Sequence, residues 1–62
     1  MDPIMVVYQA HEETKVVTFR YSESLSSFTA MCREFNYRYE IYCYAEADGR
    51  GYRLSARWPA EA

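Results

Sequence analysis

The stretch RYEIYCYAEADGRGYRLSARW, residues 38–58, decides the fold, because it predicts two strands joined by a tight turn. Neighbouring side chains of a strand point to opposite faces of a sheet, and apolar residues alternate with polar ones along both halves of this stretch. The dipeptide Asp48-Gly49 suits a two-residue type I′ turn, because both central residues of that turn need positive φ. With this turn the facing residues are Ala45 and Tyr52, Cys43 and Leu54, Ile41 and Ala56, and Tyr39 and Trp58. We therefore expect a hairpin with one buried face and one exposed face.

The length of the loop fixes the register of this hairpin. A four-residue loop over 48–51 would change the partners and keep the faces, whereas a three-residue loop would set Ile41 against Arg57 and is disfavoured. In both favoured registers Leu54 faces inward, and we expect it in the core together with Phe28. Truncation of either side chain to alanine is then expected to cost roughly 2 to 5 kcal/mol.

A second hairpin is predicted near the N-terminus, where Ile4–Ala10 and Lys15–Tyr21 alternate in the same way. If Ala10 pairs with Lys15, the facing residues are Tyr8 and Val17, Val6 and Phe19, and Ile4 and Tyr21. Because Glu-Glu is a poor turn pair, we expect the loop between these strands to use the four residues 11–14.

Between the hairpins the sequence predicts one amphipathic helix of about three turns. Its apolar residues recur at helical spacing and are Leu25, Phe28, Met31, Cys32 and Phe35. Ser22 or Ser24 can cap the N-terminus through a side-chain oxygen, and Asn36 suits a left-handed residue at the C-terminus.

The predicted order of elements is β-β-α-β-β, a single α+β domain over residues 1–62 with one helix packed on one face of a four-stranded sheet. Because the first and last strands are expected to lie side by side and parallel, joined by a right-handed crossover, we expect the strand order 2-1-4-3. The pattern is carried by IMVV (4–7), VVTF (16–19), SLSSFTAMCREF (24–35) and the Asp-Gly hairpin. Together these segments resemble a β-grasp domain, the fold of ubiquitin-like and immunoglobulin-binding bacterial domains. An antiparallel meander with the helix on one side is the alternative architecture.

Composition limits the classes of function. Half of the 62 residues are hydrophobic, seven are Tyr, and the net charge is −2, which argues against a protein held to nucleic acid by a general positive field. No apolar run approaches the length of a membrane span, and the N-terminal residues MDPIMVV lack the basic region of a signal peptide. We therefore expect a cytoplasmic protein without membrane contact.

Catalytic chemistry is not expected. The sole histidine, His11, precedes Glu12 and Glu13 in a predicted exposed turn, where an acid-base pair is conceivable but a solvated side chain is more typical. Cys32 and Cys43 are interpreted as buried small hydrophobic residues in a reducing compartment, with a disulfide between helix and sheet as the alternative. The sequence shows no metal-ligand spacing and no glycine-rich phosphate loop, so we expect no catalytic residue, metal or cofactor.

The outward face of the sheet is the more informative feature. It is expected to carry Val16, Thr18 and Arg20, then Met5, Val7 and Gln9, then Arg53, Ser55 and Arg57, and finally Arg38, Glu40, Tyr42, Tyr44 and Glu46. Tyr and Arg are enriched at binding hot spots, so we select Tyr42, Tyr44, Arg53 and Arg57 as candidate partner-binding residues. In the alternative interpretation the tyrosines only support strand pairing, and the arginines stack on them or pair with glutamates.

Acidic residues in the two predicted turns form a second candidate site. Glu12, Glu13 and Asp48 either belong to an ordinary solvated surface or imitate phosphates and occupy a basic groove of a nucleic-acid-handling protein.

The size, acidity and uncovered Tyr/Arg face favour a protein-binding inhibitor that docks on a larger nucleic-acid-handling complex. In size, composition and architecture the chain resembles small phage-encoded anti-CRISPR proteins. That resemblance implies a protein partner such as a CRISPR surveillance complex in the host cytoplasm, whose recognition of DNA would be blocked by steric or phosphate-mimicking contacts.

Two alternatives are retained. One is a single-stranded nucleic-acid binder that stacks bases on Tyr42 and Tyr44 and holds phosphates with Arg20, Arg53 and Arg57. The net negative charge opposes it. The other is a β-grasp adaptor or a self-associating domain, and we expect a monomer or a weak homodimer.

Overall fold

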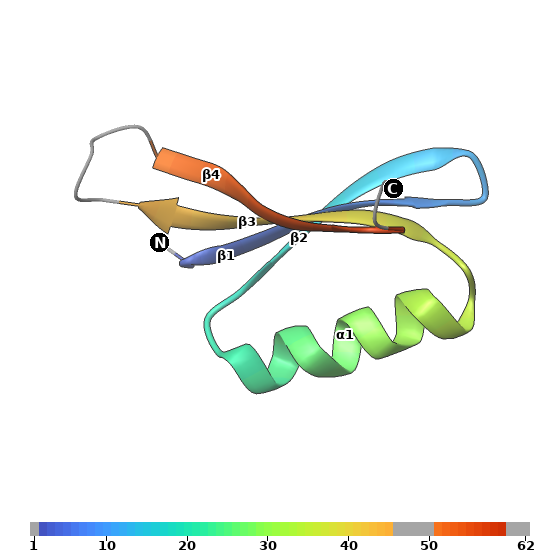
Figure 1. Ribbon diagram of the computed structural model, residues 1–62, viewed down its shortest axis with the longest axis horizontal. Helices are drawn as coiled ribbons and strands as arrows, with labels where there is room; N and C mark the ends of the chain where they lie inside the picture. Colours follow the sequence, from blue (N-terminus) through green and yellow to red (C-terminus); the bar gives the residue numbers. More distant parts are fainter. Residues whose placement is uncertain (1, 46–50, 60–62) are drawn as a thin grey trace.

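The structure is a computed structural model that describes residues 2–45 and 51–59. The described elements are β1 (Ile4–Ala10), β2 (Glu13–Phe19), α1 (Ser22–Glu34), β3 (Arg38–Ala45) and β4 (Gly51–Trp58). The strands form one sheet, and α1 packs against one side of it (Figure 1). The chain therefore has the α+β architecture that the sequence predicts.

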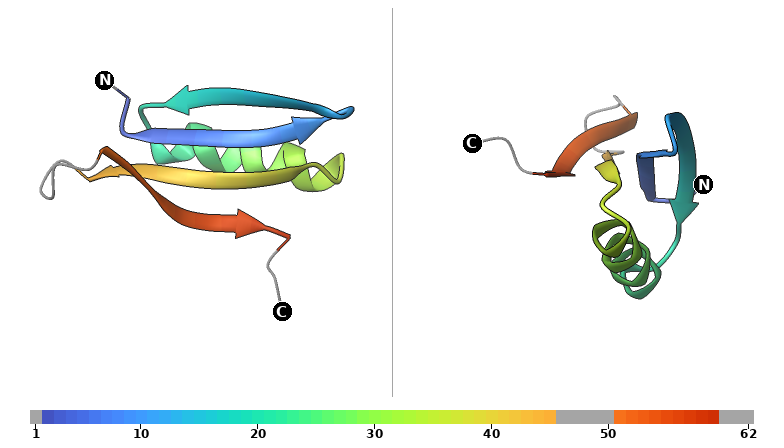
Figure 2. Two further views of the ribbon diagram at one scale, coloured as in Figure 1. Left: turned by 90° about the horizontal axis from the view of Figure 1, so that it is seen from above. Right: turned by 90° about the vertical axis from the view of Figure 1, so that its right-hand side faces the viewer.

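The strand order is β2-β1-β3-β4, and all neighbouring strands are antiparallel (Figure 2). The predicted order 2-1-4-3, with its β-grasp-like parallel central pair, is wrong. After β2 the chain returns along α1 and enters β3 in the direction of β2, so β3 runs antiparallel to β1 and pairs with it directly. The arginine-bearing strand β4 takes the edge, where charged side chains discourage pairing with another sheet.

The β1–β2 hairpin closes more tightly than the sequence suggests. Ala10 pairs with Glu13, which leaves a two-residue turn in which His11 and Glu12 have φ of 53° and 70°. The predicted four-residue loop is therefore wrong. The partners move by two positions, so Val6 faces Val17 instead of Phe19, and each residue keeps its predicted face.

The β3–β4 hairpin changes register partway along. Tyr39 faces Trp58 and Ile41 faces Ala56, as predicted, but beyond that point Tyr42 faces Leu54. Ser55 is left without a partner, which is the pattern of a β-bulge, and every residue of β4 before it changes face. The predicted Asp48-Gly49 turn lies outside the described residues.

The core lies between α1 and the first three strands in the sheet order. Val6 and Cys32 are completely buried and Tyr39 is 5% exposed. Phe28 of α1 contacts Tyr8 of β1 edge-on, with ring centroids 4.9 Å apart. Leu54 is 44% exposed, so its predicted place in the core is wrong; the bulge has turned it to the other face.

The ends of α1 explain how the helix is positioned. It begins at Ser22 after an extended Tyr21, without a side-chain cap, so the predicted serine cap is wrong. At the other end Asn36 has φ of 62°, which confirms its predicted left-handed conformation. The amides of Asn36 and Tyr37 donate to the carbonyls of Arg33 and Cys32 at 3.2 and 2.8 Å, a Schellman arrangement that turns the chain toward β3.

Candidate interaction surface

The side of the sheet turned away from α1 is the candidate functional site, and we call it the uncovered face. Residues that face each other across antiparallel strands project to the same side, so the register assigns its members. They are Thr14, Val16 and Thr18 of β2, Met5, Val7 and Gln9 of β1, Arg38, Glu40, Tyr42 and Tyr44 of β3, and Tyr52, Leu54 and Arg57 of β4. Among residues 2–45 and 51–59, no element lies over this face (Figure 2).

One half of the uncovered face is apolar. Its members are Met5, Tyr42, Tyr44, Tyr52 and Leu54, and we call them the apolar half. Met5 lies opposite Tyr42 on one side, and Leu54 lies opposite Tyr42 on the other. Tyr44 is 37% exposed, and its ring meets that of Tyr52 edge-on at a centroid distance of 5.3 Å. Three strands therefore contribute to one hydrophobic surface.

The N-terminal segment holds this half in place. The amide of Tyr44 donates to the carbonyl of Pro3 at 2.8 Å, and the hydroxyl of Tyr52 donates to the carbonyl of Asp2. The carboxylate of Asp2 accepts a hydrogen bond from Thr18 at 2.8 Å and pairs with Arg20 at 3.6 Å. Asp2 thus connects both edge strands.

Tyr42 is the member of the apolar half that adjoins the charged residues Glu40 and Arg57. Its hydroxyl donates to Glu40 Oε1 at 3.2 Å. Desolvation and the neighbouring Glu40 raise the pKa of Tyr42, whereas Arg57 acts in the opposite direction. The phenol therefore stays protonated at neutral pH and serves as a hydrogen-bond donor.

The other half of the face is hollowed and polar, and we call it the polar hollow. Its volume is about 350 Å³. Its polar lining consists of Gln9, Thr14, Arg38, Glu40 and Arg57, and its apolar lining consists of Val7, Tyr39, Trp58 and Pro59. It lies toward the β1–β2 turn, because Gln9 and Thr14 are the residues next to the last pair of that hairpin.

The structure unites only part of the predicted site. Tyr42, Tyr44 and Arg57 share the uncovered face, but Arg53 lies opposite Cys43 on the side of α1. Its predicted place on the outward face is therefore wrong, because the bulge at Ser55 reverses the alternation of β4.

The acidic candidates lie elsewhere. Glu12 is in the β1–β2 turn, and Glu13 begins β2 and lies 3.9 Å from Lys15 Nζ. Asp48 lies outside the described residues. The strand ends Ala45 and Gly51, which flank residues 46–50, are at the opposite end of the sheet from the β1–β2 turn.

Two residues of β4 on this face were missed by sequence reasoning. Tyr52 and Leu54 share the parity of Trp58, which does face α1, so alternation alone places all three inside. The sequence feature that could have indicated the bulge is Ser55, a small polar residue in the middle of the strand. A serine at this position does not by itself specify a bulge.

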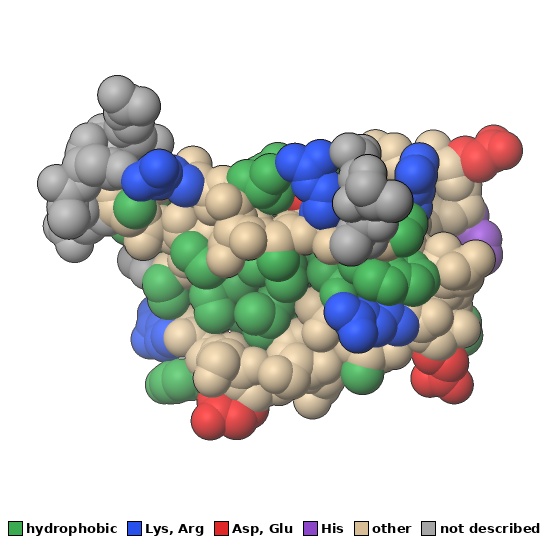
Figure 3. Space-filling model, in the orientation of Figure 1, with side chains coloured by type: hydrophobic (Ala, Val, Ile, Leu, Met, Phe, Trp, Pro, Cys, Tyr) green, Lys and Arg blue, Asp and Glu red, His purple; other side chains and the backbone are tan. Residues whose placement is uncertain are grey.

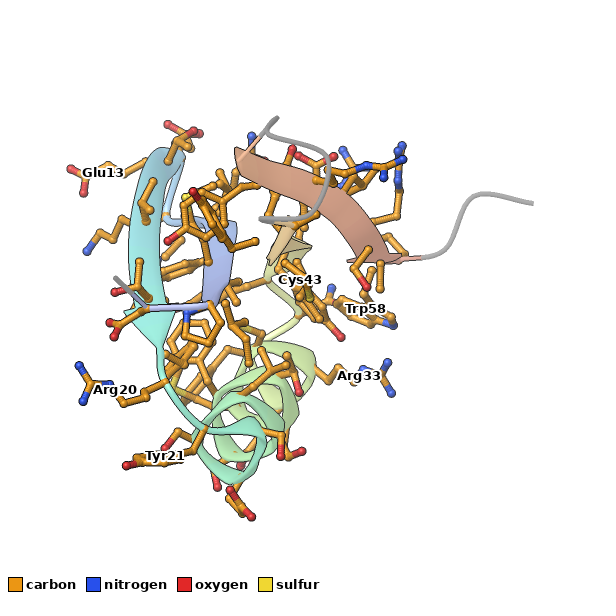
Figure 4. The ribbon with its side chains drawn as sticks, turned by 90° about the vertical axis from the view of Figure 1, so that its left-hand side faces the viewer. Glu13, Arg20, Tyr21, Arg33, Cys43 and Trp58 are labelled. Atoms are coloured by element: carbon orange, nitrogen blue, oxygen red, sulfur yellow. The ribbon has the colours of Figure 1, made fainter. Side chains whose placement is uncertain are left out.

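The helix leaves a second hydrophobic area open beside β4. Figure 3 shows hydrophobic side chains between α1 and the sheet on this side of the molecule. Arg33 donates to the hydroxyl of Tyr39 at 3.2 Å, and its guanidinium carbon lies 5.9 Å from the ring centre of Trp58. Arg33 and Trp58 project to the same side in Figure 4. In this area the guanidinium of Arg33 therefore lies over the indole ring of Trp58.

The cysteines occupy different surroundings. Cys32 is buried, as predicted, and burial raises the pKa of its thiol. Cys43 is exposed, so its predicted burial is wrong; it lies near the C-terminal end of β3, which extends beyond α1 in Figure 1. Both thiols are free, and the alternative disulfide is not formed.

His11 and the possible metal-ligating side chains form no further candidate site among the described residues. His11 is exposed, and its Nε2 lies 3.2 Å from the hydroxyl oxygen of Tyr37. Within residues 2–45 and 51–59, no group of three His, Cys, Asp or Glu side chains could hold a metal ion, and no helix is long and apolar enough to cross a membrane.

Comparison of the chain with protein-family models, with curated proteins and with solved structures gave no match. The interpretation of the uncovered face therefore depends on its own chemistry.

Proposed function

We propose that the chain is a non-catalytic protein-binding module that docks on a larger protein through the uncovered face of its sheet. The observation that carries this proposal is the apolar half, where Met5, Tyr42 and Leu54 adjoin one another across three strands without a covering element among the described residues. Contiguous apolar surface of this kind, bordered by charged residues, is typical of interaction sites.

The specific form of the proposal is an inhibitor that obstructs a nucleic-acid-handling complex, as small phage-encoded anti-CRISPR proteins do. The small size and the net charge of −2 support this form. Obstruction by the face is preferred to phosphate mimicry, because Glu12 and Glu13 lie at the end of the sheet and Lys15 stands beside Glu13. Tyr42, Tyr44 and Arg57 are then the predicted residues that contact the partner.

The test is affinity capture with the full chain and two matched aspartate variants. Leu54→Asp places a charge in the apolar half, whereas Ser27→Asp places it on an exposed position of α1. Proteins retained by the wild type and by Ser27→Asp but lost by Leu54→Asp are the expected partners, and mass spectrometry identifies them. Circular dichroism must show that both variants fold. Equal capture by the two variants contradicts docking through this face.

A single-stranded nucleic-acid binder is the second candidate, favoured by one observation: Tyr42 and Arg57 share the uncovered face. Its test is a fluorescence titration with a labelled oligonucleotide at low salt. Micromolar binding that is lost in Tyr44→Ala would replace the protein-binding proposal.

A second copy of the chain is another occupant that the face could accept. Size-exclusion chromatography with light scattering distinguishes it from a foreign partner. A dimer that Leu54→Asp dissociates would assign the face to self-association.

A further inference from the structure

The two edges of the sheet are protected to different extents. β4 has a bulge at Ser55, a positive φ of 73° at Gly51 and a proline directly after Trp58, and these features hinder the addition of another strand. β2 pairs with β1 along all 7 of its residues in one unbroken register. In Figure 2 no described strand or helix lies beyond β2. A further strand can therefore be added at the edge of β2.

The register shows which backbone groups this edge presents. The amide of Tyr44 donates to the carbonyl of Pro3, so the odd-numbered residues of β1 bond to β3. The even-numbered residues of β1 consequently bond to β2, and their partners are Glu13, Lys15, Val17 and Phe19. The backbone groups of Thr14, Val16 and Thr18 therefore point away from the sheet. No other described residue forms a hydrogen bond with these backbone groups.

The residues that present these groups are symmetric about Val16. Thr14 and Thr18 flank Val16 at equal spacing, and Val16 itself is 59% exposed. In an antiparallel pair of β2 strands centred on Val16, valine faces valine and threonine faces threonine. Each of these residues then exchanges both of its backbone hydrogen bonds with the second copy, and the whole of β2 takes part. The palindromic order of these β-branched residues therefore suits a second copy of the same strand.

The charged residues of β2 are compatible with this register. Glu13 faces Phe19 of the second copy and Lys15 faces its Val17, so no like charges lie directly opposite each other. The two Lys15 side chains approach each other diagonally across the axis, but the Nζ of each lies 3.9 Å from the carboxylate of its own Glu13. A pairing centred on Lys15 would set lysine directly against lysine and is disfavoured.

We propose that two copies of the chain associate through β2, by an antiparallel strand pair centred on Val16, into one continuous sheet. Facing residues of paired strands project to the same side, so both α1 helices lie on one side of this sheet and both uncovered faces lie on the other. The inference concerns an edge of the sheet and does not depend on the proposed function. It adds that a partner of the uncovered face meets two copies of that face side by side.

The test is sedimentation equilibrium of the full chain with a charge-swap pair. Val16→Lys and Val16→Glu each place like charges opposite each other across the axis, so each should raise the dissociation constant of the dimer at least about tenfold. An equimolar mixture sets lysine against glutamate and should restore the dimer. Ser27→Lys, on an exposed position of α1, is the matched control and should associate like the wild type. Circular dichroism checks that the variants fold.

Amide hydrogen exchange of the wild type, followed by NMR, locates the contact without a substitution. Protection of the amides of Thr14, Val16 and Thr18 should rise with protein concentration. The amides of Lys15 and Val17, which bond to β1, should be protected at every concentration. This measurement decides the outcome if the Val16 variants do not fold.

Four results would overturn the proposal. The wild type may not be monomeric up to about 1 mM, a range in which even weak pairing is measurable. The dimer must not survive in both Val16 variants, and their mixture must associate more tightly than either alone. A dimer that Leu54→Asp dissociates uses the uncovered face instead. Edge amides that gain protection only when a captured protein is added assign β2 to a foreign strand.

The outcome can be separated from that of the proposed function. Capture of proteins by the wild type and its loss in Leu54→Asp test the uncovered face, whether or not the chain dimerises. Association of the Val16 variants tests the β2 edge in the absence of any partner, so either proposal can fail while the other stands.

Discussion

The side of the sheet beneath α1 and the uncovered face differ sharply in burial, although their strands alternate in the same way. Val6 and Tyr39 on the helix side are 0% and 5% exposed, whereas Leu54 and Val16 on the uncovered face are 44% and 59% exposed. A helix with its side chains is roughly 10 Å wide, and four strands about 4.8 Å apart are nearly twice as wide. One helix can therefore complete the core over β2, β1 and β3, but it reaches β4 only in part, at Trp58, and leaves the other face uncovered.

This difference separates residues that stabilise the fold from residues that remain available to a partner. Burial of Val6, Cys32 and Tyr39 removes apolar surface from water within the chain itself. The apolar surface of the apolar half is removed from water only when another molecule covers it. Substitutions on the two sides should therefore differ in their effects on stability and on binding.

The largest expected contrast is in the reactivity of the two thiols. Cys43 is exposed and should react promptly with a disulfide reagent such as Ellman's reagent, whereas Cys32 is fully buried with a raised pKa. Modification of Cys32 must wait for the core to open and should be roughly 1000-fold slower. Absorbance at neutral pH measures both phases. The Cys43→Ser variant should lose the fast phase only, and comparable rates for the two thiols would show that α1 does not seal the core.

Phe28→Ala should produce the next largest effect, a loss of about 3 kcal/mol in the free energy of unfolding. The ring of Phe28 contacts Tyr8 at 4.9 Å and Phe19 at 5.3 Å between centroids, so its removal leaves a cavity beneath the sheet. Urea denaturation followed by circular dichroism provides the measurement. If the alanine variant does not fold, Phe28→Leu should fold with a smaller loss. A loss below about 1 kcal/mol for the alanine variant would contradict this core.

Leu54→Ala is the matched truncation on the uncovered face and should cost less than about 1 kcal/mol. Leu54 is already 44% exposed, so truncation creates no enclosed cavity. The same urea experiment applies, and the dependence of the free energy on urea concentration should not change. A loss equal to that of Phe28→Ala would place Leu54 in the core and contradict the bulge at Ser55.

Sequence reasoning succeeded where a local pattern determines structure. The spacing of apolar residues predicted the helix, and Asn36 predicted its left-handed end. The pairs Tyr39 with Trp58 and Ile41 with Ala56 were also correct. The order of strands was not, because alternation assigns faces to residues but does not say which strands are neighbours. Antiparallel pairing of β1 with β3 depends on the path that α1 takes across the sheet.

The candidate site was predictable to a similar extent. Tyr42, Tyr44 and Arg57 were placed together correctly, because the extra residue, Ser55, lies in β4 before Arg57 and leaves the alternation of β3 unchanged. Arg53 and Leu54 exchanged faces because Ser55 bulges, and one unpaired residue reverses the parity of all residues on its far side. The polar hollow could be predicted only if the pairing of β1 with β3 were known, and the sequence pattern does not determine that pairing.

The smallest expected effect is a loss of stability at high pH that depends on Tyr42. Desolvation and Glu40 raise the pKa of Tyr42 in the folded chain, so the folded state holds its proton more tightly than the unfolded state does. The stabilising contribution is complete below the ordinary tyrosine pKa of about 10 and is lost as pH rises through the folded value. Urea midpoints of the wild type should therefore fall more steeply above pH 10 than those of Tyr42→Phe, in which every other titrating group is unchanged. Parallel pH profiles of the two proteins would show that the hydrogen bond to Glu40 does not distinguish the folded state, and Tyr42 would then belong to the freely solvated part of the uncovered face.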